Sequence, residues 1–284
     1  KLAFYFIFIT ASAFSQKSDQ FELFPEKNYA GFHFDDDFLF LGNKDEQYTG
    51  GLEFEYIRAS KKNKEKRGLF NPFSQGQRFW TYTFGSYLYT PYNVSDSLII
   101  LNDRPFSSYI YSSIGYTAYC RSNLRKLSVE FYLGIMGSSL PGRIQERVHT
   151  VGESPPAYGW ENRIVEDETF IPNICVNYQE NLFTSNRIRI LPIDWIQVGS
   201  ILELNTGFYM NNISGGFKIS AFNFDPLRRR NNIANSKEKK LKITSYFMPQ
   251  LQLVAQNTSL QSLVWFDSPY KIPTDEMNRH VWIL

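Results

Sequence analysis

The stretch "PGRIQERVHTVGESPP", residues 141–156, places a Gln and a His on one short predicted helix. Pro141 suits a first helical turn and Gly152 suits a helix end, so we expect a helix between them. Gln145 and His149 are four residues apart and therefore share one helix face. An imidazole is suited to general-base chemistry, although a lone His on a helix is more often structural. The spacing alone leaves both interpretations open.

Carboxylates and a hydroxyl gather in a second stretch, "HFDDDFLFLGNKDEQYTGG", residues 33–51. Asp35, Asp36 and Asp37 end one expected strand, and the turn Tyr48 to Gly51 opens the next. Adjacent carboxylates suit a hard, oxygen-binding cation such as calcium. An acidic surface loop is the plain alternative, and the cluster by itself does not exclude it.

Basic residues are the third chemical feature. Arg104 follows Asp103 just before an expected strand, where it can pair with that carboxylate or with a phosphate. Arg143 and Arg147 are four residues apart on a second face of the predicted helix, and ordinary surface arginines are the alternative for all three. Longer basic runs at 58–68 and 228–240 predict loops, which are either solvated or in contact with anionic lipid headgroups.

The elements that must position these residues alternate with a period of two. In "GGLEFEYIRAS" the residues Leu52, Phe54 and Tyr56 take one face and the glutamates between them take the other. Clear alternation recurs at 127–135 and 241–256. Weaker patterns run through 79–89, 109–119, 170–178, 188–204, 213–222 and 262–266. These segments predict an all-β protein.

The first residues, "KLAFYFIFITASAFSQ", are typical of a secretory signal with small residues near its cleavage site. We expect residues 1–15 to be a signal peptide, clipped at its start, and 16–284 to form a single domain. The net charge of +2 gives no basis for nucleic-acid binding. Cys120 and Cys175 could pair in an oxidising compartment, but we expect ordinary packed strand cysteines.

Strand-length segments behind a secretory signal are typical of a transmembrane antiparallel β-barrel. Closing the sheet removes the exposed edges that so many strands would leave. The pattern predicts ten to fourteen strands. A soluble β-sandwich shows the same alternation and is the alternative.

A family resemblance joins these features. The ordered set "DDDFLFLGNKDEQYTGGLEF", "YTPYN", "NDRPFSSYIYSSIG" and "GIMGSSLPGRIQERVHTVGESPPAYGWENRI" resembles the lipid A 3-O-deacylase family of Gram-negative outer membranes. The similarity runs to about Ile164; later residues match only as strands. The His segment is the most specific, with Gly134, Gly137, Gly142, Gln145, His149, Gly152, Trp160 and Asn162 in register.

The resemblance implies an outer-membrane barrel of about twelve strands, with a short helix in an extracellular loop carrying the active site. We expect the barrel to be a monomer. The resemblance also implies a calcium-dependent esterase that removes the 3'-acyloxyacyl group of lipid A. The expected partner is thus the lipid A of lipopolysaccharide in the outer leaflet, and the protein is embedded in the membrane. His149 would be the general base, with Thr49 and Asp37 as further catalytic residues. The implied calcium ligands are Asp36, Asp37 and Glu153, and the substrate-binding candidates are Gln145, Arg104, Arg143 and Arg147.

Several positions depart from the family pattern. Asp36 stands where the family usually has Asn, and Gly50 replaces the Asn of a Thr-Asn-Gly turn. None of the departures removes a proposed catalytic group. A catalytically inactive relative, a porin-like or structural barrel, and a soluble carbohydrate-binding β protein are the other function classes.

Overall fold

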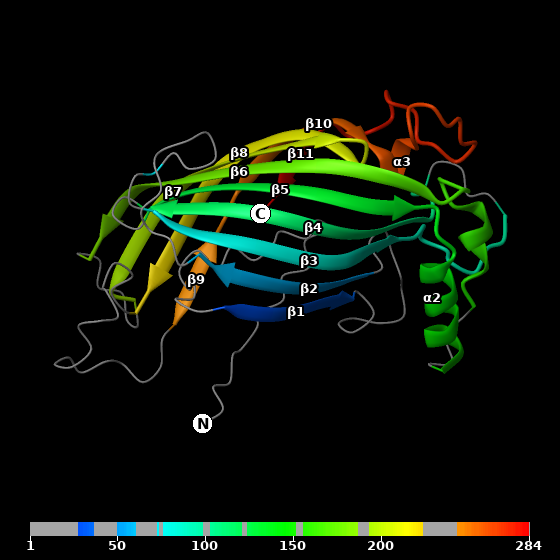
Figure 1. Cartoon of the computed structure of the whole chain (residues 1–284). Coiled ribbons are helices and arrows are strands. Elements are labelled where there is room, and N and C mark those ends of the chain that lie inside the picture. The colour runs from blue at the N-terminus through cyan, green and yellow to red at the C-terminus, as the bar shows by residue number, and fades with distance from the viewer. Residues whose placement is uncertain are drawn as a thin grey trace.

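The computed structural model describes residues 28–36, 50–60, 73, 76–98, 103–120, 124–151, 156–186, 193–223 and 243–283. These residues form one antiparallel sheet of eleven strands, in the order β1-β2-β3-β4-β5-β6-β7-β8-β10-β11, with β9 paired beside β10 on β8 (Figure 1). The strands are β1 (Tyr29–Asp36), β2 (Gly50–Ala59), β3 (Gln77–Tyr89), β4 (Ser107–Cys120), β5 (Arg125–Met136), β6 (Thr169–Ser185), β7 (Trp195–Gly207), β8 (Met210–Phe222), β9 (Thr244–Phe247), β10 (Gln250–Asn257) and β11 (His280–Ile283).

The sheet curves strongly, and within the described residues its path ends at β1 and β11 without pairing them (Figure 1). Within the described residues, α2 (Leu140–Val151) and then the 3-10 helix η1 (Tyr158–Asn162) lie between β5 and β6, and α3 (Thr258–Gln261) follows β10. Across the described ranges, no helix combines the length and the apolar character needed to cross a bilayer.

The two faces of the sheet decide between barrel and sandwich. Along β8, Ile213, Phe217 and Ile219 are exposed, whereas Ser214, Lys218 and Ser220 alternate with them and are buried. A sandwich buries its apolar face between two sheets, so it would show the opposite pattern. Apolar residues outward and polar residues inward are the pattern of a transmembrane barrel, and the predicted fold class is confirmed.

Two strand predictions were wrong in detail. The described part of the predicted segment 241–256 forms two strands, β9 and β10, and the ladder is interrupted at Met248 and Pro249 because proline has no N–H to donate. The segment 262–266 is a turn after α3, in which Leu263 is buried and its carbonyl accepts from the Phe266 amide at 3.0 Å. Five alternating residues were too short a pattern to define a strand. Cys120 on β4 and Cys175 on β6 are thiols and not a disulfide, as expected for packed strand cysteines.

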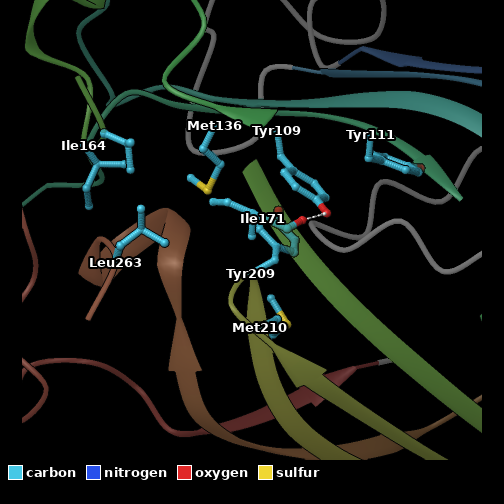
Figure 2. Close-up of a cluster of buried hydrophobic side chains, with 9 residues drawn as sticks. Tyr109, Tyr111, Met136, Ile164, Ile171, Tyr209, Met210 and Leu263 are labelled. Carbon is cyan, nitrogen blue, oxygen red and sulfur yellow. Dashed lines mark hydrogen bonds between the residues drawn. The ribbon is translucent and has the colours of Figure 1, made fainter. Parts of the chain in front are cut away.

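A buried cluster fills the interior at the end of the sheet where β5 leads into α2. Tyr109 stacks on Tyr209 with ring centroids 4.1 Å apart, and its hydroxyl donates to the Ile171 carbonyl at 3.2 Å (Figure 2). We call this set the tyrosine plug; its buried members are Tyr109, Tyr111, Met136, Ile164, Val165, Ile171, Tyr209, Met210 and Leu263. Deeper inside, the Tyr111 hydroxyl donates to Glu53 at 2.6 Å.

Candidate functional site

The helix predicted between Pro141 and Gly152 is α2, which starts four residues after β5 ends. Gly137 makes the turn with φ +81, and a Cβ there would lie 2.3 Å from the Asp167 carbonyl oxygen. Glycine is needed at that position for both reasons. The short turn fixes the start of α2 close to the rim, by which we mean the end of the sheet that holds the tyrosine plug.

One face of α2 is fixed by Trp160 of η1. The indole Nε1–H donates to the Gln145 side-chain oxygen at 2.5 Å, and both side chains are buried. Gly142 lets the helix approach, because a Cβ there would lie 2.6 Å from Trp160 Cγ. Trp160 in turn packs on Phe106, with ring centroids 5.3 Å apart. His149 is one turn beyond Gln145 and is half-buried, so it shares the helix face that carries Gln145.

Asn162, two residues after Trp160, forms hydrogen bonds with two other connections. The Asn162 amide donates to the Ser97 carbonyl at 2.8 Å, and the Tyr270 hydroxyl lies 3.3 Å from Asn162 Oδ1. Arg163 Nε donates to the Gly137 carbonyl at 2.9 Å. The β5–β6, β3–β4 and β10–β11 connections are therefore held together here. Arg163 and Tyr270 were missed from the sequence, because nothing in their local pattern marks a contact over 26 or 108 residues.

Arg104 also joins rim segments. Its guanidinium lies 3.8 Å from the centroid of the Tyr89 ring, and its Nη2 donates to Ser259 Oγ at 2.9 Å. Burial lowers the pKa of Arg104, but a group with an ordinary value of 12.5 stays charged at physiological pH. Asp103 accepts from the backbone amides of Tyr92 and Arg104 instead of holding the guanidinium. The predicted phosphate candidate therefore bridges β3 and α3.

Arg143 and Arg147 are exposed, and they lie on the side of α2 away from Trp160. Their spacing puts them on neighbouring turns of one face, as predicted. They lie on the helix face opposite Gln145, whose side chain is buried against Trp160. The predicted substrate-binding residues thus fall into separate groups.

The acidic part of the predicted site is described only through its backbone. Asp36 ends β1 opposite Gly50, while its side chain and all of Asp37, Thr49 and Glu153 lie outside the described residues. Within the described part of the chain, no group of three or more His, Cys, Asp or Glu residues could hold a metal. The calcium ligands therefore stay a prediction.

Strand register gives the distance at the rim between the end of β5, where α2 begins, and the end of β1, where Asp36 lies. Gly50 pairs with Leu88 and Leu88 with Ser108, so Asp36 lies at the rim, as Met136 at the end of β5 does. Four strand spacings separate β1 from β5, about 19 Å. The 12 residues of α2 span about 18 Å. Figure 1 shows α2 at this end of the sheet, with its axis across the strand direction.

Comparisons with known proteins agree with this architecture. A family model described as "Outer membrane protein LpxR" matches residues 2–282. A solved structure, LpxR from Salmonella typhimurium, superposes with a TM-score of 0.59 over 84% of this chain and 76% of that one, at 14% sequence identity. That identity supports the fold alone. No curated protein matched the sequence.

The family match covers nearly the whole chain, including the second half, where the motifs had given only a strand pattern. It agrees with the apolar-out, polar-in sheet and with the rim helix after β5. The chain is therefore an outer-membrane protein of the LpxR family, the lipid A 3-O-deacylase family that its motifs resemble.

Proposed function

We propose that this protein is a calcium-dependent lipid A deacylase that hydrolyses the ester-linked 3'-acyloxyacyl group. The observation that carries the proposal is the clamped helix α2. The contacts of Gln145 and Gly142 with Trp160 hold one face of α2 against η1, and that face carries Gln145 and His149. A structural barrel has no need of a buried Gln–Trp hydrogen bond that orients one imidazole-bearing helix.

The chemistry of the acidic donors fits calcium. Asp36 and Asp37 supply hard carboxylate oxygens, and the loop after α2 supplies Glu153. Asp36 ends β1 at the rim that also carries α2, and the length of α2 matches the four strand spacings between them. When bound, calcium would polarise the acyl carbonyl and stabilise the oxyanion.

The chain's own groups would perform the proton transfers. His149 takes a proton from a water molecule as that water attacks the acyl carbonyl carbon. The ester C–O bond then breaks, and the proton held by His149 passes to the departing 3' oxygen. Gln145 holds the helix turn that precedes His149, and Thr49 orients the water. A Thr49 nucleophile is less favourable, because the hydroxyl has no evident activating base.

A porin-like role is the alternative, and the interior argues against it. The tyrosine plug joins β4, β5, β6 and β8 with the segment after α3, and nine buried side chains fill this end (Figure 2). Along the inner wall, the hydroxyl of plug residue Tyr111 reaches over Gly85 of β3 and donates to Glu53 of β2 at 2.6 Å. A water-filled channel would need that space to be open.

Mass spectrometry of lipid A from cells that express the protein or His149→Ala tests the proposal. Removing a general base costs about 10² to 10⁴ in rate, so the acyloxyacyl loss should occur only with the unaltered chain. His280→Ala is the matched control, because His280 is exposed on β11. Equal deacylation by His149→Ala, with the barrel folded, would refute the role of His149.

Metal dependence is tested on purified protein. Chelation should abolish hydrolysis, and calcium should restore it, whereas Asp37→Ala should need far more calcium or fail to respond. Deacylation that continues unchanged in excess chelator would contradict the calcium proposal while leaving the deacylase proposal intact.

A further inference from the structure

The outer side of α2 carries an apolar stripe that the proposed reaction does not use. More than half of each of four side chains is exposed: Leu140, Ile144, Val148 and Val151. Their spacing of four, four and three residues puts them on one strip of the helix surface. Four neighbouring apolar side chains left open to solvent mark a surface that contacts something else.

Charge flanks this stripe on one side. Arg143 and Arg147 are exposed and lie beside it on the helix, while the buried face with Gln145 is on its other side. Long basic side chains next to an apolar strip can reach anionic headgroups while the strip contacts acyl chains. Glu146 and Thr150 are exposed farther round, on the polar side.

The lipid-facing surface of the barrel continues to the start of α2. Phe170, the second residue of β6, is 67% exposed and pairs in register with Ile135, one residue before β5 ends. The same rim carries the exposed side chains of Phe208 and Trp265, whose rings lie 4.9 Å apart. Aromatic residues gather where a barrel meets the membrane interface.

We infer that α2 is an interfacial helix whose stripe of Leu140, Ile144, Val148 and Val151 lies among the acyl chains of the surrounding outer leaflet, with Arg143 and Arg147 at the lipid phosphates. The helix axis runs across the strands, and therefore along the membrane surface (Figure 1). The inference concerns the bilayer around the barrel and stands whether or not the proposed hydrolysis is correct. Its occupant is lipid rather than a protein partner.

Site-specific fluorescence in vesicles tests this inference. The full chain, with Cys120 and Cys175 replaced by alanine, receives one cysteine at Ile144 or Val151, or at Glu146 or Thr150 as matched controls on the polar side. Each variant carries an environment-sensitive label and is reconstituted in vesicles of phosphatidylcholine and phosphatidylglycerol. All four positions are exposed, so folding should tolerate them.

The labels at Ile144→Cys and Val151→Cys should shift to shorter emission wavelengths and show a several-fold loss of quenching by aqueous iodide. Those at Glu146→Cys and Thr150→Cys should stay quenched. Equal quenching at all four positions would overturn the inference. Shielding that appears only after outer-membrane protein extract is added would overturn it in favour of a protein partner. Because no activity is measured, neither result bears on the proposed hydrolysis.

Discussion

Two connections at the same rim fold in opposite ways. The β10–β11 connection turns inward: Thr258, Ser262 and Leu263 are almost fully buried, and Ser262 Oγ donates to the Ile164 carbonyl at 3.2 Å. The β5–β6 connection sends α2 outward, with Val151 86% exposed. The β5–β6 connection also supplies Ile164 and Val165 to the tyrosine plug, but its helix α2 is an arm held at one face. If α2 contacts lipid as we infer, a lipid would reach this arm from the side while the buried plug stays closed.

The largest effect that separates plug from arm is on stability. Leu263→Ala removes a buried plug side chain and should lower the free energy of unfolding by about 2–5 kcal/mol. Leu140→Ala makes the same change on exposed α2 and should stay within about 0.5 kcal/mol. Urea unfolding in detergent micelles, followed by tyrosine and tryptophan fluorescence, measures both. Equal losses would mean that the arm is packed as firmly as the plug.

A smaller and more local effect comes from the tether of the arm. Trp160→Phe keeps the aromatic contact with Phe106 but leaves the buried Gln145 oxygen without its indole donor. The loss of one intramolecular hydrogen bond costs about 0.5–1.5 kcal/mol. That cost should appear as faster amide hydrogen exchange in residues 140–151, with the exchange of β4 and β5 unchanged.

The matched control for the tether is Trp265→Phe, because Trp265 is exposed at the same rim. It should leave exchange in α2 unaltered. If Trp160→Phe also leaves α2 exchange unaltered, then the hydrogen bond to Gln145 does not hold the arm. Lipid A hydrolysis should fall with Trp160→Phe while its pH profile keeps its shape, because the indole positions α2 without taking part in proton transfer.

The sequence predicts the arm better than the plug. Pro141, Gly152 and the four-residue spacing of Gln145 and His149 are local signals, and α2 follows them. The plug depends on contacts between residues far apart, such as the 120-residue separation of the Tyr89 and Tyr209 hydroxyls, which no local pattern records. The direction of the apolar face was also not predictable from alternation alone. Alternation shows that the two faces of a strand differ, but not which face meets lipid.

The glycines of the family motif also show what the sequence alone could not explain. Gly134, Gly137 and Gly142 were family matches without a reason in the sequence. The structure supplies the reasons: contact with Tyr109, a left-handed turn, and contact with Trp160. Much of the most specific motif thus builds the support of α2 and not the reaction itself. The acidic residues at the end of β1 stay a prediction for the site.

The finest comparison is between two arginines that the sequence treats alike. Arg104 stacks on Tyr89 and donates to Ser259 within the plug's surroundings, whereas Arg143 is exposed on the arm. Lysine keeps the charge but not the planar stacking or the fork of donors, so Arg104→Lys should lower the free energy of unfolding by about 1 kcal/mol. Arg143→Lys should change it by less than about 0.5 kcal/mol.

Thermal unfolding in micelles and the KM for lipid A are measured together. If Arg104→Lys raises KM without lowering stability, Arg104 binds substrate phosphate; a loss of stability at unchanged KM means that its role is to join β3 to α3, which is the result that its contacts lead us to expect.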